Sequence, residues 1–171
     1  GMLSDRIGRK SVICLGLSIF IIGSLVAAYS NTIYGVIAGR FLQGAGAISA
    51  TLAALLADAT RKEVRTKSMA FLGIGIGSSF LIALILGPII AAIFGVRALF
   101  FIAAVVAAIA IFLLLLIPSD ITKIDSRGQL KLKEVFKAKL LFMNMHIFLL
   151  HLILTMMFVV IPFLLLDQLQ I

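Results

Sequence analysis

Long apolar stretches alternate with short polar segments along the chain. An α-helix of about 20 apolar residues crosses the hydrocarbon core of a bilayer and satisfies its own backbone hydrogen bonds there. The turns at 31–33 and 95–97 are only a few residues long, so the spans on either side of each turn should form antiparallel hairpins. The pattern predicts five membrane spans, at residues 11–30, 32–57, 68–94, 98–117 and 141–166.

The composition supports a membrane protein. Of the 171 residues, 63% are hydrophobic and 13% are charged, whereas soluble domains are about 45–50% apolar and about 25% charged. These proportions exclude an ordinary soluble domain and a disordered chain. A single cysteine, Cys14, excludes a disulfide framework and a cysteine-based zinc site. The predicted fold class is therefore all-α: an integral membrane protein, part of a helical bundle, with about five transmembrane helices.

Basic residues cluster outside the predicted spans. Thirteen of the 15 lysines and arginines lie in residues 1–10, 58–67 and 118–140, which alternate with the other loops. Arg97 is the only basic residue in those other loops, and Arg40 lies within a span. Since positively charged loops stay in the cytoplasm, the three segments are predicted to be cytoplasmic, in a multi-pass protein of the inner membrane. No basic stripe with interleaved aromatic residues is present in the sequence, so no nucleic-acid partner is expected.

Residues 1–10 read Gly-Met-Leu-Ser-Asp-Arg-Ile-Gly-Arg-Lys, a charged turn between two spans. Its glycines permit positive φ angles, and its aspartate suits the free amides at a helix N-terminus. Its basic residues suit anionic headgroups. The string resembles the loop 2–3 signature of the major facilitator superfamily, G-x-L-S/A-D-R-x-G-R-K. The residues assigned to this motif are Gly1, Asp5, Arg6, Gly8, Arg9 and Lys10.

Two further stretches resemble the same family. Residues 40–47, Arg-Phe-Leu-Gln-Gly-Ala-Gly-Ala, resemble the R-x-x-Q-G signature of span four in its proton-coupled drug antiporters. The glycine-rich third span, with Gly87-Pro88 near its end, resembles span five of the antiporter branch, although alanines stand at 83, 91 and 92 where that pattern has glycines.

The three matches share one register and imply part of a twelve-span major facilitator protein. Residues 1–117 would hold loop 2–3 and spans three to six of the N-terminal bundle. Residues 118–140 would form the cytoplasmic central loop, and residues 141–171 would hold span seven, the start of the C-terminal bundle. Residues 130–140 could form an amphipathic helix on the inner leaflet or a solvated linker, and the sequence favours neither.

The resemblance implies a network of charges on the cytoplasmic side. In the family's fold the loop 2–3 signature lies against the cytoplasmic end of span four, where Asp58 stands in this chain. Asp5, Arg9 and Asp58 would then brace the closed cytoplasmic side as a two-state latch. The alternative is a set of solvated loop charges.

Arg40 lies about 12 Å deep in its span by helical rise. A charge at that depth costs at least about 2.5 kcal/mol, so it should face the bundle interior or extend to the interface. The family assigns this position to proton coupling through a nearby carboxylate. We therefore predict coupling roles for Arg40 and for Gln43, one turn further along, although a glutamine in a span more often joins helices.

His151 lies about ten residues into the fifth span, near the depth at which transporters hold coupling sites. It is the third residue predicted to take part in proton coupling; a satisfied core histidine is the alternative. His146 is five residues away, which does not place the two rings on one helix face for a metal, so no metal site is expected. Four residues are predicted to serve helix bending or close packing: Gly44, Gly77, Gly87 and Pro88.

The sequence shows no catalytic triad, no phosphate-binding glycine loop and no cluster of metal ligands, so an enzyme is not expected. The resemblance implies a monomeric transporter that exports small amphipathic or cationic compounds in exchange for protons, by alternating access in the lipid bilayer. Its energy source would be the proton gradient, without a cofactor. Two alternatives stay open: a facilitator of the same fold that carries sugars or other metabolites, and a membrane scaffold that transports nothing.

Overall fold

The computed structural model describes residues 8–46, 48–116 and 138–169, and every regular element in these ranges is an α-helix. The all-α prediction is confirmed. The chain divides into two compact units, Gly1–Arg127 and Gly128–Ile171.

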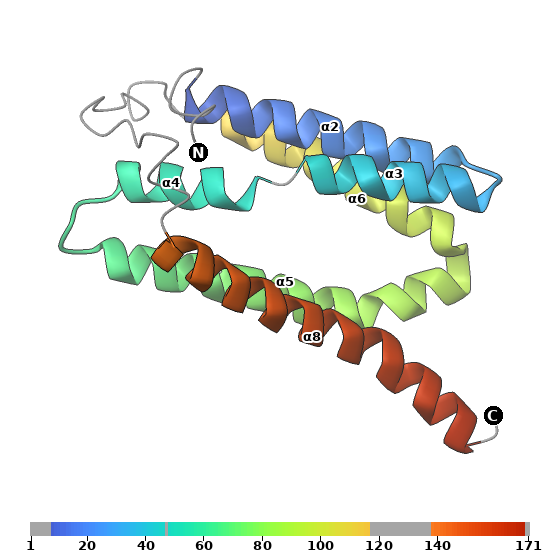
Figure 1. Cartoon of the computed structure of the whole chain (residues 1–171). Coiled ribbons are helices and arrows are strands. Elements are labelled where there is room, and N and C mark those ends of the chain that lie inside the picture. Colours follow the sequence, from blue (N-terminus) through green and yellow to red (C-terminus); the bar gives the residue numbers. More distant parts are fainter. Residues whose placement is uncertain (1–7, 47, 117–137, 170–171) are drawn as a thin grey trace. The chain divides into compact units, whose positions relative to one another are not determined.

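Helix α2, Arg9–Tyr29, is the first described helix of the first unit (Figure 1, blue). It packs along α3, Ile33–Ala45, and along α6, Val96–Leu116, and it also contacts α4, Ser49–Ala59. The face of α2 that is buried consists mostly of small residues, which allow neighbouring helices to approach closely. The buried residues of α2 are Ile13, Gly16, Gly23, Ser24, Ala27 and Ala28.

Two pairs of glycines set the close approach of α2 to the span that follows it. A Cβ atom placed on Gly39 would lie 2.6 Å from the carbonyl oxygen of Gly23, and one placed on Gly23 would lie 2.7 Å from the carbonyl oxygen of Gly39. Gly16 and Gly46 oppose each other in the same way. A Cβ atom on Gly16 would lie 3.0 Å from the carbonyl oxygen of Gly46, and one on Gly46 would lie 2.5 Å from the carbonyl oxygen of Gly16. Any side chain at these positions would push the two backbones apart.

Gly44, in contrast, faces open space within the described residues: a Cβ atom there would meet nothing within 4 Å. The close packing expected of this glycine-rich segment therefore lies at Gly46. Gly77 and Gly87 have equally open surroundings in the part of the chain that is described. Packing of these three glycines against further helices stays a prediction.

The second predicted span, 32–57, corresponds to the apolar segment Ile33–Ala59, but this segment contains two helices. It consists of α3 and α4, which end and begin on either side of residue 47 (Figure 1). The amide of Gly46 donates to the carbonyl of Leu42 at 3.0 Å, and Leu52 donates to Ile48 at 2.9 Å as α4 begins. Two glycines close to the break weaken the helix locally, because glycine loses more backbone entropy than other residues on becoming helical.

Helix α5 runs from Arg65 to Phe94 without interruption, although it contains Pro88. Figure 1 shows that its axis changes direction in the C-terminal part, as a proline that removes one backbone hydrogen bond would cause. Gly95 then joins α5 to α6 with a φ of 80°, a left-handed conformation that strongly favours glycine. None of the residues of α5 is buried.

In the described part of the chain, four segments are long and apolar enough to cross a membrane: Arg9–Tyr29, Ile33–Ala59, Arg65–Phe94 and Val96–Leu116. They correspond to the first four predicted spans. The second unit contains α8, Ala138–Leu169, which includes the whole predicted fifth span and a shorter apolar helical stretch, Leu141–Met157. The question of an amphipathic helix at 130–140 falls largely outside the described residues.

Candidate functional site

Gly8 precedes the first turn of α2 with a φ of 99° and a ψ of 141°. Only glycine adopts this backbone conformation without strain, which explains its place in the predicted motif. Its carbonyl accepts the first hydrogen bond of the helix, from Val12 at 3.2 Å. Three other motif residues, Gly1, Asp5 and Arg6, lie outside the described residues, so the predicted part of Asp5 in a charge network stays a prediction.

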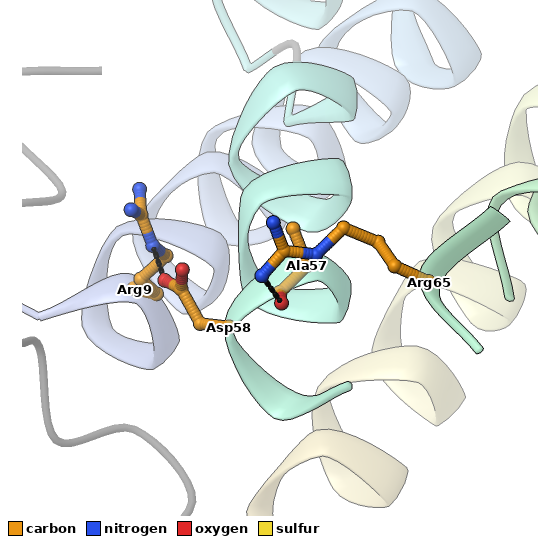
Figure 2. A network of polar contacts seen from close by, with 4 residues as sticks. All are labelled: Arg9, Ala57, Asp58 and Arg65. Atoms are coloured by element: carbon orange, nitrogen blue, oxygen red, sulfur yellow. Dashed lines mark hydrogen bonds and ion pairs between the residues drawn. The ribbon is translucent and has the colours of Figure 1, made fainter. Parts of the chain in front are cut away.

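Arg9 and Asp58 form an ion pair between α2 and α4, with Nε of Arg9 2.6 Å from Oδ2 of Asp58. Figure 2 shows the two groups directed toward each other, although they are 49 residues apart in the chain. Each charge alone would oppose its helix dipole, because Arg9 begins α2 and Asp58 lies near the end of α4. Pairing offsets both unfavourable interactions. The two side chains are 14% and 38% exposed, so the contact remains accessible to water.

Two more basic side chains connect helix ends near this ion pair. Arg65, at the start of α5, donates through Nη2 to the carbonyl oxygen of Ala57 at 2.9 Å (Figure 2). Nζ of Lys10 donates to the carbonyl oxygen of Leu115 at 3.2 Å, close to the end of α6. Cations at a helix C-terminus satisfy carbonyls that have no partner within the helix. The basic residues that indicate a cytoplasmic end thus also join α2, α4, α5 and α6 there.

A chain of hydrogen bonds connects α3 to α2 within the membrane-spanning part of the first unit. Nη1 of Arg40 donates to Oε1 of Gln43 at 2.8 Å, and Nε2 of Gln43 donates to Oγ of Ser24 at 2.7 Å. Oγ of Ser24 donates in turn to the carbonyl oxygen of Phe20 at 2.8 Å. Gln43 is 6% exposed and Ser24 is fully buried, whereas Arg40 is exposed. The structure thus brings together two of the three residues predicted to couple protons.

Ser24 is the residue of this hydrogen-bonded series that was not predicted from the sequence. Its signal was weak but present: it is a hydroxyl in an apolar span, next to Gly23 on the row of small residues that forms the buried face of α2. Such a hydroxyl either bonds back to its own helix or joins a neighbouring one, and Ser24 does both.

The two histidines lie on α8, in the second unit, and both are exposed there. Nδ1 of His151 makes a 2.9 Å hydrogen bond to the carbonyl oxygen of Ile147, and Nδ1 of His146 makes one of the same length to Phe142. A carbonyl oxygen only accepts, so Nδ1 would be the donor in each of these two bonds. Among the described residues, no group of three or more side chains is suited to a metal ion.

At the opposite end of the first unit, Arg97 joins two parts of the structure. The sequence identified it only as an isolated basic residue. Nη2 of Arg97, at the start of α6, donates to Oδ1 of Asn31 at 2.6 Å and to the carbonyl oxygen of Ser30 at 3.2 Å. Beside it the rings of Tyr29 and Phe101 meet edge to face, with centroids 5.2 Å apart. The turn between α2 and α3 is thereby joined to α6.

Comparison with known proteins gives a family match for the whole chain. A family model described as the Major Facilitator Superfamily matches residues 1–171. The Inner membrane transport protein YajR of Escherichia coli is 45% identical over 168 residues, which cover 95% of this chain and 37% of YajR. An uncharacterized transporter of Buchnera aphidicola from Schizaphis graminum is 44% identical, over 95% of this chain and 43% of that protein.

Multidrug resistance protein 2 of Bacillus subtilis is 34% identical over 132 residues, or 76% of this chain and 33% of that protein. The chain thus spans well under half the length of each of these relatives.

Proposed function

Because the chain belongs to the major facilitator superfamily, we propose that the whole protein is a secondary active transporter that exports small amphipathic or cationic compounds in exchange for protons. Transport would follow alternating access, in which the binding of protons and of substrate each favours a different conformation. The protein would act as a monomer in the inner membrane, and the proton gradient would supply the energy without a cofactor.

The observation that carries this proposal is the position of Arg40. A guanidinium within a membrane span is costly and marks a functional site by default. Arg40 is also held in place, since its Nη1 donates to Oε1 of Gln43 at 2.8 Å. A fixed positive charge can favour the ionised state of a carboxylate brought near it and so bias where a proton binds. That carboxylate would belong to a span outside this chain.

The ion pair between Arg9 and Asp58 supports alternating access. A charged contact that is partly open to water can form in one conformation and break in another at modest cost, which is what a latch requires. In the proposed closed state Asp5 would join it from the loop 2–3 motif.

Similarity to Multidrug resistance protein 2 favours a broad class of amphipathic or cationic substrates over a single metabolite. The proposed location in the inner membrane agrees with the name of the YajR relative. A facilitator that carries sugars or other metabolites is the second candidate, and it is favoured by the alanines at 83, 91 and 92. A scaffold is the third, but it gives no reason to place Arg40 in a span.

The test uses the full-length protein in inside-out membrane vesicles with an acidified interior. Addition of a transported compound should release protons from the vesicles, and release should be lost in Asp5→Asn and in Arg40→Ala. The panel consists of cationic and lipophilic molecules. If none of them releases protons although the protein is folded and inserted, the antiporter proposal is overturned. The facilitator hypothesis is then favoured. Full coupling in Arg40→Ala would show that this arginine only extends to the interface.

A further inference from the structure

We propose that Ser24 is a positioning residue for proton coupling: its hydroxyl fixes the orientation of the Gln43 side-chain amide, which in turn holds the guanidinium of Arg40. This inference rests on the proposed function, in which Arg40 couples proton movement to export. It concerns a residue of α2 that lies outside each of the three sequence motifs.

The direction of each hydrogen bond supports the proposal. Arg40 donates to Gln43, Gln43 donates to Ser24, and Ser24 donates to a backbone carbonyl of its own helix. All three bonds therefore point the same way, from the positive charge toward the backbone of α2. Hydrogen bonds aligned in this manner polarise one another, so that each strengthens the next.

The chemistry of the two ends allows one orientation of the Gln43 amide. Arginine has donors only, so the oxygen of the amide must face Arg40. The hydroxyl proton of Ser24 is committed to Phe20, so Ser24 offers an acceptor and the amide nitrogen must face it. A rotated amide would present its NH₂ group to the guanidinium and lose that contact, and the Ser24 hydroxyl would have to leave the Phe20 carbonyl to donate to the amide oxygen. Ser24 thus selects the state of Gln43 that can bind Arg40.

The surroundings hold Ser24 in this role. Its side chain is fully buried, and the neighbouring Gly23 brings the backbones of α2 and α3 into contact, since a Cβ atom there would lie 2.8 Å from the amide nitrogen of Gln43. Because the two backbones are this close, the short side chain of Ser24 on α2 can bond directly to the amide of Gln43 on α3. Within the described residues no buried side-chain nitrogen or oxygen lacks a partner.

Three substitutions separate positioning from packing. Ser24→Ala removes the acceptor. Ser24→Cys keeps a side chain of similar size but offers only a weak acceptor, and Ser24→Thr retains the hydroxyl. The matched control is Ser18→Ala, because Ser18 is on the same helix and its hydroxyl makes the same bond to the carbonyl four residues earlier, Cys14 at 2.8 Å, from an exposed position.

The readout is the number of protons released for each substrate molecule moved by the full-length protein in vesicles. A variant that is merely less stable lowers both fluxes in the same proportion and leaves this ratio unchanged. We expect Ser24→Ala and Ser24→Cys to lower the ratio at least twofold, while Ser24→Thr and Ser18→Ala keep it. An unchanged ratio in Ser24→Ala and Ser24→Cys, measured on folded protein, would overturn the proposal.

A second measurement keeps the inference separate from the proposed function. The side-chain amide of Gln43 can be observed by nitrogen-15 NMR as the glutamine signal that is absent from Gln43→Leu, and its protons should exchange slowly with water. Faster exchange in Ser24→Ala, but not in Ser18→Ala, supports positioning even if the wild-type protein moves no protons. Unchanged exchange would overturn the positioning role independently of transport.

Discussion

Replacing Gly39 with alanine tests whether the glycine contacts hold α2 against α3. The new Cβ atom would lie 2.6 Å from the carbonyl oxygen of Gly23 and 2.7 Å from the amide nitrogen of Ala27. Both are backbone atoms, so no side-chain rotation can relieve the contact. Ordinary carbon–oxygen contact requires about 3.4 Å, and α2 and α3 must therefore separate by several tenths of an ångström.

The cost can be worked from this separation. A gap of about 0.5–1 Å forfeits a quarter to a half of the dispersion energy between facing atoms, and overpacking of this kind typically costs about 1–3 kcal/mol. Alanine recovers up to about 1 kcal/mol through its higher helix propensity. The same separation would stretch the 2.7 Å hydrogen bond between Gln43 and Ser24 toward the limit of hydrogen bonding. The net result should be a loss of about 1–2 kcal/mol.

The assay is thermal unfolding of the full-length protein in detergent, and the control is Gly44→Ala. Gly44 lies in the same helix, but a Cβ atom there meets nothing within 4 Å in the described part of the chain. We expect Gly39→Ala to unfold at a lower temperature than the wild type, and Gly44→Ala to unfold at the same or a slightly higher temperature. Equal unfolding temperatures for the two variants would refute the packing argument.

Three other predictions concern the ends of the first unit. Arg9→Gln or Asp58→Asn should lower transport severalfold while changing the free energy of unfolding by less than about 1 kcal/mol, since the pair is partly exposed; the charge-reversed double variant should recover part of the transport rate. Gly8→Ala should destabilise the start of α2 by about 1–2 kcal/mol because φ is 99°, seen as faster amide exchange in its first turn. Arg97→Ala and Asn31→Ala should each lower the unfolding temperature, and the double variant should add little to either, because both remove one 2.6 Å contact.

Hydropathy predicted the helices well, because in lipid an apolar stretch of this length has few alternatives to a helix. The break between α3 and α4 was not predicted. The apolar pattern continues through residues 46–48, and hydropathy does not register a local loss of helical hydrogen bonds. The glycines at 44 and 46 were the available signal. Within the described residues, Gly46 packs closely against Gly16, whereas Gly44 has open surroundings.

Site residues that belong to a family motif were predicted from the sequence. Residues that meet only because two helices cross were not. Arg9 and Asp58 were paired by the family resemblance, and the structure joins them at 2.6 Å. Ser24 and Asn31 were not singled out, since their partners lie 19 and 66 residues away. Which of several hydroxyls or amides meets a given partner depends on where two helices cross. That crossing is set by small residues whose pairing a single sequence does not reveal.

Helix α2 makes polar contacts with its neighbours at three levels, and their chemistry differs with depth. At the end predicted to be cytoplasmic, Arg9 and Lys10 use charge, where water can replace a lost contact. In the buried middle Ser24 contacts the neutral amide of Gln43, and at the opposite end Arg97 reaches the turn that follows α2. A contact that water can replace is cheap to break, whereas a buried one leaves unsatisfied groups. The Arg9–Asp58 pair should therefore cost less to open than the buried bond between Gln43 and Ser24.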